Sequence, residues 1–518
     1  MVAPSPRKVK SRRKPPSPNS VLDRSALIQA LDDHGISYKP SHIEGLYQAL
    51  HRANYPDLPD FVSHYLENER LLSERDSSSP PLAPLKNAVT NRKNRNRFNL
   101  PNRLLRFLQD PKNGLVTLTS TIQQAKTSSD GTTTKVAVRL HDGQLVESVI
   151  MRYTSVGGSR ASLCVSSQCG CAMGCTFCAT GTMGLSGNLT AGEILEQVVH
   201  ADHLLADEWN QKDEESRRKK HELVRNVVFM GMGEPLDNYR NVVEACKALI
   251  DCKRWNLAHD RVTVSTVGLV SQIRKLTNEL PEVSLALSLH APTQEAREKI
   301  VPTARRYPIE ELIDAVDGHM MAYLEKRRER LRQRPNYTAT ERMKESSKRR
   351  AMIEYVMLEG ETSTLEAAHQ LGRLCADRHL VVNLIPYNST DVKDKLRCPS
   401  WDRMQEFRDI VASYKTFVTI RRTMGADIAS ACGQLITQEK EAAEEKTAVV
   451  VRDIEETGTS PKEPDSVEDE VVQRDSSKVE TCQPDLERWI PPLAAATGLA
   501  ATCFLVSTTL FLRRRGAK

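Results

Sequence analysis

Apolar positions in the second half of the chain follow two alternating patterns. Short apolar runs that suit buried strands are followed by segments with apolar residues at helical spacing, and this pair repeats about six times. Such repetition is typical of a parallel sheet covered by helices. We therefore predict an α/β fold based on a partial (β/α)6 barrel. The predicted strands are 224–230, 261–266, 283–289, 352–358, 380–385 and 417–421, and the predicted helices are 242–250, 309–324, 365–376 and 401–414.

The pattern is different near the N-terminus. Residues 1–20 are rich in Pro, Ser, Lys and Arg and contain no acidic residue, which predicts a disordered basic tail. Apolar residues at helical spacing then predict a small helical accessory domain over 21–75. Ser and Pro residues favour a linker over 76–98.

A β-hairpin is predicted between this linker and the core. Residues 135–140 and 145–151 alternate between apolar and polar side chains on either side of the turn sequence His141-Asp142-Gly143. We place the hairpin in a segment 99–156 that joins the core, and the core itself in 157–437.

The C-terminal part has two further segments. Residues 438–487 are acidic and lack aromatic side chains, which predicts a disordered tether. Within 488–518, the uncharged run Leu493–Leu512 has the length of roughly 20 residues that crosses a bilayer. We interpret 488–518 as a membrane anchor, with a weakly hydrophobic amphipathic or buried helix as the alternative.

Charge and cysteine usage narrow the class of protein. The net charge of +6 is too small to indicate a class of partner. The basic stretches 7–14, 92–97 and 326–350 could attract a polyphosphate backbone. The alternative is that their side chains are solvated surface charges. Five of the twelve cysteines lie between Cys164 and Cys178. This placement argues against a secreted disulfide scaffold and favours metal or redox chemistry in a reducing compartment. No apolar signal peptide opens the chain, so we expect a cytoplasmic protein, tail-anchored to an organelle membrane if the anchor inserts.

Three cysteines on a glycine-containing loop form the strongest chemical motif. Cys171, Cys175 and Cys178 are spaced four and then three residues apart. Thiolates at this spacing can each ligate one iron of a [4Fe-4S] cluster and leave the fourth iron without a protein ligand. That iron can chelate the amino and carboxylate groups of S-adenosylmethionine (SAM), so that one electron breaks the sulfonium bond and yields a 5′-deoxyadenosyl radical. The alternative is a structural zinc site that recruits Cys169, although this spacing differs from that of usual zinc sites.

Polar residues follow several of the predicted strands. Gly233 and Glu234 directly follow one strand, where glycine lets the backbone approach a ligand and Glu234 can accept a hydrogen bond from an ammonium group. Ligand sites in parallel α/β folds lie at the carboxyl ends of the strands. We therefore expect one ligand site formed by Gly233, Glu234, Ser265, Ser288, Leu289, His290 and Asn388.

With these motifs the chain resembles the RlmN-type family of radical SAM RNA methyltransferases. The resemblance covers roughly residues 21–435 and is clearest after residue 163. It rests on motifs in the same order along the chain: Leu163-Cys164-Val165-Ser166-Ser167-Gln168, the cysteine loop, Met230-Gly231-Met232-Gly233-Glu234-Pro235, Val264-Ser265-Thr266, Ser288-Leu289-His290-Ala291-Pro292, Asn383-Leu384-Ile385-Pro386-Tyr387-Asn388 and Ala431-Cys432-Gly433-Gln434-Leu435.

The resemblance implies cofactors and roles for individual residues. It implies a radical SAM barrel with a [4Fe-4S] cluster, and it implies that the strand-end residues named above bind SAM. Cys432 is implied to take a methyl group from one SAM; a radical made from a second SAM then removes hydrogen from this S-methyl group, and the carbon radical adds to C2 of an adenine. Glu147 is implied to be the proton acceptor. Cys164 is implied to release the RNA by forming a disulfide with Cys432.

Without the resemblance, these three residues have simpler interpretations. Cys164 and Cys432 suit core packing, and Glu147 suits a solvated hairpin. The chain also departs from the family pattern. Cys169 could compete for iron, and the basic insertion 326–350 is either an RNA-contacting loop or a helix extension; the basic tail and the C-terminal segments lie outside the family body.

The predicted function is therefore methylation of adenine C2 in rRNA or tRNA. RNA and an electron-donor protein are the predicted partners, with membrane contact through the C-terminal segment, and the oligomeric state stays open. C8 methylation, as in the related Cfr-type enzymes, is the alternative within the same chemistry. The alternative from another class is a non-catalytic, membrane-tethered RNA-binding or zinc-stabilised scaffold.

Overall fold

The computed structural model describes residues 13–73, 98, 100–155, 158–211, 223–332, 351–390 and 396–435. The predicted tether 438–487 and anchor 488–518 lie outside these ranges, so the anchor stays a prediction. Among the helices in the described ranges, none has both the length and the apolar character needed to cross a membrane.

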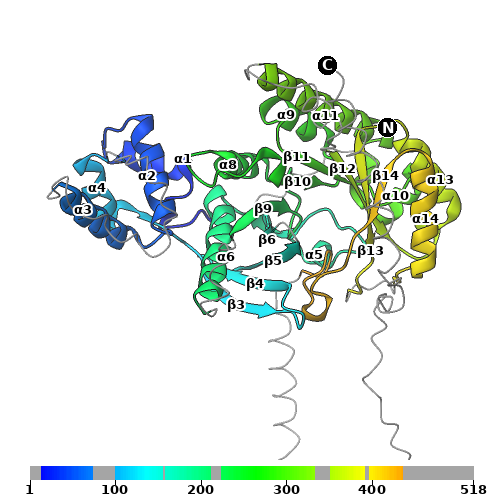
Figure 1. Ribbon diagram of the computed structural model, residues 1–518, viewed down its shortest axis with the longest axis horizontal. Helices are drawn as coiled ribbons and strands as arrows, with labels where there is room; N and C mark the ends of the chain where they lie inside the picture. Colours follow the sequence, from blue (N-terminus) through cyan, green and yellow to red (C-terminus); the bar gives the residue numbers. More distant parts are fainter. Residues whose placement is uncertain are drawn as a thin grey trace, which may run out of the picture. The chain divides into compact units, whose positions relative to one another are not determined.

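A ten-stranded sheet forms the centre of the fold (Figure 1). Seven neighbouring strands are parallel, from β14 at one edge to β6, and three antiparallel strands continue the sheet to β3. The predicted α/β fold is confirmed, and β6 adds one parallel strand to the six that were predicted. In sheet order the strands are β14 (Phe417–Ile420), β13 (Leu380–Pro386), β12 (Ala351–Met357), β11 (Ser284–Ser288), β10 (Val262–Thr266), β9 (Val224–Phe229), β6 (Gly158–Cys164), β5 (Leu145–Ser155), β4 (Thr133–Arg139) and β3 (Thr121–Thr127).

Helices connect the parallel strands, because parallel neighbours cannot be joined by a tight turn. Helix α11 continues to Arg332, eight residues beyond the predicted helix end, so residues 326–332 of the basic insertion extend a helix. The rest of that insertion lies outside the described ranges. The helices are α6 (Ala191–Gln211), α8 (Tyr239–Ile250), α9 (Val270–Glu279), α10 (Gln294–Ile300), α11 (Ile309–Arg332), α13 (Leu365–Cys375) and α14 (Trp401–Ser413).

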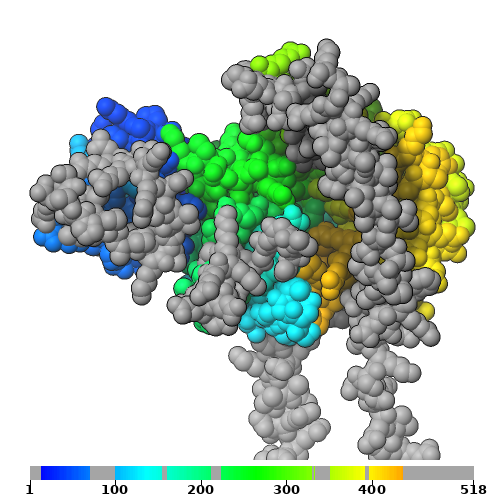
Figure 2. Space-filling view, viewed as in Figure 1, coloured from blue at the N-terminus to red at the C-terminus, as the bar shows by residue number. Residues whose placement is uncertain are grey.

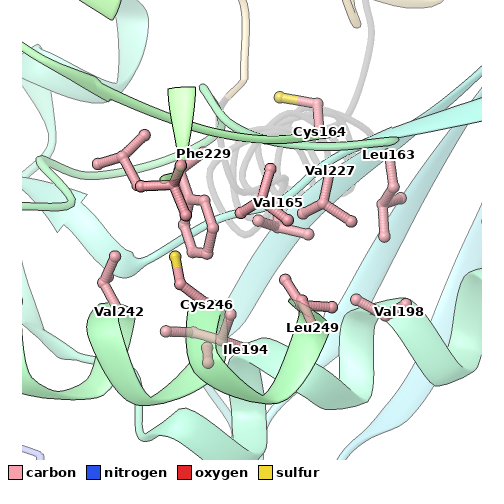
Figure 3. Close-up of a cluster of buried hydrophobic side chains, with 14 of the residues drawn as sticks. Leu163, Cys164, Val165, Ile194, Val198, Val227, Phe229, Val242, Cys246 and Leu249 are labelled. Atoms are coloured by element: carbon pink, nitrogen blue, oxygen red, sulfur yellow. The ribbon is translucent and has the colours of Figure 1, made fainter. Parts of the chain in front are cut away.

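Alternation along β6 separates the core from the site. Leu163 and Val165 are fully buried and point toward α6 and α8, whereas the thiol of Cys164 between them points to the other side of the sheet (Figure 3). Each fully buried aliphatic side chain of this kind contributes roughly 1.5–3 kcal/mol relative to an exposed one. Packing of Leu163 and Val165 therefore holds the strand in place, and the buried thiol of Cys164 lies on the opposite side of the sheet.

The buried side chains of the N-terminal helices belong to the same hydrophobic cluster as those of the sheet. Within the predicted domain 21–75 lie α1 (Arg24–Asp33), α2 (Pro40–Arg52) and α3 (Leu58–Ser73), and α4 (Asn102–Gln109) packs against α3 from outside that range. The Asp23 carboxylate caps α1 by accepting a hydrogen bond from the N–H of Ala26.

The predicted disorder of residues 1–20 does not hold for residues 13–20. The side chain of Arg13 is only 5% exposed and forms ion pairs with Asp142 (2.7 Å) and Glu193 (2.6 Å). Strand β1 (Asn19–Ser20) then pairs with β2 (Leu115–Val116). The composition of residues 1–20 predicted disorder because this segment has no apolar core of its own. Residues 13–20 are ordered against the rest of the protein instead, because the buried carboxylate of Glu193 needs a cation and Arg13 supplies it.

Candidate active site

The three-cysteine loop connects β7 (Gln168–Cys171) to the short helix α5 (Ala179–Thr182). The N–H of Thr176 donates to the carbonyl of Ile300 at 3.0 Å, which ties the loop to the end of α10. Burial raises the pKa of Cys171 to about 12, and it also raises the pKa values of Cys175 and Cys178. The thiols are therefore neutral until a metal centre displaces their protons.

Cys169 does not join this group, which corrects the expectation that it could compete for iron. Strict alternation would place Cys169 and Cys171 on the same face of β7, but a bulge lies between Cys169 and Gly170, and Gly170 has a φ of +73°. The groups that act on the Cys169 thiol are instead Arg13 and Glu193. Burial raises the pKa of Cys169 to about 12, so it is a neutral core thiol. Its position also removes the fourth ligand of the alternative zinc site.

A cavity at the carboxyl ends of the parallel strands brings most of the predicted residues together. This first cavity contains about 940 Å³ of atom-free space, part of which is open solvent. The predicted residues that line it are Cys171, Cys175, Cys178, Gly233, Glu234, Ser265, Ser288, His290 and Cys432.

Two predicted ligand residues lie elsewhere. The side chain of Leu289 is fully buried, its N–H donates to the carbonyl of Glu354, and its carbonyl accepts from Arg297. Leu289 therefore does not reach the first cavity. Asn388 lines a neighbouring second cavity and donates to the carbonyl of Cys432 at 3.3 Å.

Glu234 is held rigidly in the wall of the first cavity. One carboxylate oxygen accepts from the N–H of Leu236 at 3.0 Å and the other from the N–H of Val267 at 2.9 Å. Burial raises the pKa of Glu234 to about 7, against the lowering effect of these hydrogen bonds. A cationic ligand would favour the ionised form and so bind more tightly where Glu234 has lost its proton.

His290 presents a neutral imidazole. The N–H of Val356 donates to its Nδ1 at 3.1 Å, so Nε2 carries the hydrogen. Burial, and then the charge of Arg297, lower the pKa of His290 to about 3. Phe177 from the cysteine loop packs edge-on against the ring. His290 can therefore donate a hydrogen bond without carrying a charge.

Gly233 leaves no room for a side chain. Its φ is +99°, and a Cβ built there would lie 2.5 Å from Cβ of Gln168. The amide oxygen of Gln168 accepts from the N–H of Glu234 at 2.8 Å. The glycine thus lets the backbone of this turn press against Gln168, which in turn places Glu234.

Cys432 lies between the two cavities. It lines the first cavity with the cysteine loop, and it lines the second together with Cys164 and Asn388. The loop that carries it is tied to α5: the N–H of Ala179 donates to the carbonyl of Gly433 at 2.8 Å. In Figure 2 the surface of this C-terminal loop (orange) adjoins that of the β3–β4 hairpin (cyan). The tertiary fold thus brings a thiol from the end of the core to the cysteine loop.

The other two predicted catalytic residues flank this loop. Cys164 lines the second cavity, and burial, followed by the nearby Cys432, raises its pKa to about 12. Both are free thiols, so the predicted disulfide between them is not formed in this structure. Glu147 is 1% exposed, not solvated, and its carboxylate pairs with Lys135 at 3.1 Å. Lys135 also lies 3.5 Å from the carbonyl of Ala429 in the Cys432 loop.

Sequence reasoning missed two charged residues in the cavity walls. Glu354 lies inside β12 and lines the first cavity, and Arg421 directly follows β14 and lines both cavities. The pKa of Arg421 is raised mainly by its electrostatic interaction with the nearby Cys432. The signal available for Arg421 was its position at a strand end, and for Glu354 a single charge within an apolar strand.

Known proteins resemble the chain over this region. A family model of the radical SAM superfamily matches residues 165–318. The dual-specificity RNA methyltransferase RlmN 1 of Myxococcus xanthus is 40% identical over 309 residues, which cover 60% of this chain and 74% of that relative. The chain belongs to the RlmN family. The ribosomal RNA large subunit methyltransferase N of Nitrosopumilus maritimus is 38% identical over 313 residues, covering 60% of this chain and 78% of that relative. A crystal structure of a radical SAM methyltransferase from Sphaerobacter thermophilus matches with a TM-score of 0.59 and 31% identity, covering 80% of this chain and 98% of that one.

Membership of the RlmN family implies a [4Fe-4S] cluster and SAM, and the residues present fit both. The three thiols line one cavity wall. Within the described ranges, no three His, Cys, Asp or Glu side chains surround one point where a single metal ion would lie, but a cubane needs each thiolate on a different iron. Gly233 and Glu234 line the same cavity, and the carboxylate of Glu234 suits the ammonium group of SAM.

Proposed function

We propose that this enzyme methylates C2 of an adenine in rRNA, tRNA or both, through an S-methylcysteine at Cys432. The observation that carries the proposal is the position of Cys432 between the two cavities. A thiol there can take a one-carbon unit from a cofactor in the first cavity and present it to a base in the second. C2 of adenine is an amidine carbon and a poor nucleophile, so a covalent carrier avoids direct transfer from SAM.

The proposed reaction uses three side chains, which are Cys432 on the C-terminal loop and its neighbours Glu147 and Cys164. The Cys432 sulfur forms a bond to the methyl carbon of one SAM, which leaves as S-adenosylhomocysteine, and the thiol proton goes to solvent. When bound, the cluster and a second SAM supply the 5′-deoxyadenosyl radical, which removes one hydrogen atom from the S-methyl group. The methylene carbon of Cys432 then bonds to C2. Glu147 takes the C2 proton while one electron passes to the oxidised cluster, when that is bound, and the ring is restored. Cys164 loses its proton to solvent and its sulfur bonds to the Cys432 sulfur. The carbon–sulfur bond breaks with its electron pair on the methylene carbon, which takes up one proton and becomes the C2 methyl group.

The structure supports these assignments by position. Cys164 and Cys432 share the second cavity, and Lys135 links the carboxylate of Glu147 to the Cys432 loop. We further propose that Gly233, Glu234, Ser265, Ser288 and His290 bind SAM. Asn388 contributes by holding the Cys432 backbone.

The test is product analysis with matched cysteine variants. Enzyme reconstituted without oxygen and incubated with RNA, SAM and a reductant should yield 2-methyladenosine, identified by mass spectrometry and co-elution with standards. Cys432→Ala should abolish the product, whereas Cys252→Ala, at an exposed cysteine, should match the wild type. A product that co-elutes with 8-methyladenosine would favour the C8 alternative, and a Cys432→Ala variant that still methylates RNA would refute the mechanism.

A further inference from the structure

We propose that the guanidinium of Arg421 donates a hydrogen bond to one of the two ring nitrogens that flank C2 of the target base, and so acts as a catalytic residue for carbon–carbon bond formation. This inference rests on the proposed function and names a contact on the substrate side of the same site.

Arg421 is fixed at the boundary of the two cavities. Its backbone N–H donates to the carbonyl of Leu384 at 2.8 Å, directly after the last residue of β14. The side chain is 27% exposed and lines both cavities, as Cys432 does. Tyr153, an aromatic residue of the kind on which bases stack, also lines the second cavity. A base in the second cavity with C2 toward Cys432 would therefore have a ring nitrogen beside Arg421.

The protein uses few of the donors of this guanidinium. Among the described residues, its side chain makes a 3.8 Å contact to the sulfur of Met230 and a 3.9 Å ion pair with Glu354. A guanidinium has five N–H donors, and polar groups in a cavity wall usually find partners. Arg421 therefore has donors free for a ligand.

Glu354 holds the guanidinium in orientation. One of its carboxylate oxygens accepts from Asn383 at 3.0 Å, and Asn383 in turn accepts from the hydroxyl of Thr419 at 2.5 Å. These residues lie side by side on β12, β13 and β14. The second oxygen of Glu354 is buried, has no hydrogen-bond partner within the described ranges and faces Arg421. The buried carboxylate thus keeps a cation at this boundary.

The contact would matter most during bond formation. When the methylene carbon of Cys432 bonds to C2, this sulfur-substituted, electron-rich radical shifts electron density into the electron-poor ring, mostly onto the flanking nitrogens. A fixed cation that donates to one of these nitrogens stabilises that charge distribution more than it stabilises the unreacted base. Arg421 keeps all of its protons throughout, so no further acid or oxidant is required.

The experiment compares Arg421→Gln with the wild type on three RNA oligonucleotides, which carry adenosine, 1-deazaadenosine or 3-deazaadenosine at the target position. Removing a charged donor from such a site lowers rates by about 100-fold or more. We expect Arg421→Gln still to form S-methyl-Cys432 and 5′-deoxyadenosine, and to lose about 100-fold in 2-methyladenosine for each S-methylated enzyme molecule; yields are compared in this way because Arg421 also acts on the Cys432 thiol. The control Arg408→Gln, at an arginine that pairs with Asp409 on α14, should leave every readout unchanged.

The deaza substrates decide whether the contact is to a ring nitrogen. One of the two should slow the wild type about as much as the Arg421→Gln substitution does, and the substitution should not slow that substrate further. Equal losses in Arg421→Gln on all three substrates would overturn the inference, and so would failure of the variant to methylate Cys432. A wild type that makes no methyladenosine from the adenosine substrate would refute the proposed function itself, which separates the two failures.

Discussion

Replacing Gly233 by alanine tests how the glycine turn builds the cofactor site. The methyl group would lie 2.5 Å from Cβ and 2.8 Å from Cγ of Gln168, which is closer than non-bonded carbon atoms can approach. Gln168 would have to move, and the hydrogen bond from the N–H of Glu234 to its amide would be lost. We expect Glu234 to shift away from the position in which it can bind the ammonium group of SAM.

The magnitude follows from two contributions. Alanine at a φ of +99° costs about 1–2 kcal/mol. The lost hydrogen bond leaves a buried N–H unsatisfied, which costs a further 1–3 kcal/mol or so. If between half and all of the second contribution, about 0.5–3 kcal/mol, appears in binding, SAM affinity falls by about 2- to 160-fold.

Gly143→Ala is the matched control. Gly143 has a φ of +83°, but a Cβ there would meet no atom within 4 Å. It should lower thermal stability by the backbone contribution alone and leave SAM affinity unchanged. The assay is calorimetric SAM binding to reconstituted enzyme, with thermal unfolding of each variant. The reasoning is wrong if Gly233→Ala binds SAM as the wild type does, or if Gly143→Ala loses affinity equally.

Three further predictions concern parts of the fold around the site. Cys169→Ser should keep the wild-type iron content after reconstitution, because Cys169 faces Arg13, whereas Cys175→Ser should not; equal iron loss in both would contradict the placement of Cys169. Arg13→Ala should lower the free energy of unfolding by about 3–5 kcal/mol in denaturant titrations, since the buried carboxylate of Glu193 loses its arginine partner, and an unchanged midpoint would show that the ion pair is dispensable. Asp202 is buried, and burial raises its pKa to about 7 from 3.8. Between these two pKa values the native protein holds a proton that the unfolded chain has released, so the wild-type free energy of unfolding falls as pH rises. Asp202→Asn keeps the acceptor for the N–H of Val224, and its free energy of unfolding should exceed that of the wild type by up to about 4 kcal/mol at about pH 8 and by nothing at about pH 4. Unfolding curves that show no such difference would refute the assignment.

The parallel sheet could be predicted because strand and helix periodicities are local. Predicted strands such as 224–230 and 380–385 match β9 and β13 to within one residue at each end. The cysteine spacing and the motif at Gly233 also lie within short stretches, so their chemistry could be predicted from neighbouring residues. Polar residues follow several of the predicted strands. Because the carboxyl ends of parallel strands lie at one edge of the sheet, this was enough to predict that most of these residues meet there.

Other features depend on contacts between residues that are far apart in the chain. The bulge at Gly170 turns Cys169 away from the cysteine loop, and nothing in residue type distinguishes the two thiols. Arg13 is buried because it forms an ion pair with Glu193, which lies 180 positions further along the chain. Arg421 and Glu354 come together because β12, β13 and β14 are neighbours in the sheet, and Cys432 reaches the cysteine loop through a hydrogen bond between Ala179 and Gly433. Local sequence thus specified which chemical groups are present, whereas strand register, backbone conformation and burial, which arise only when the chain is folded, decided which of them face each other.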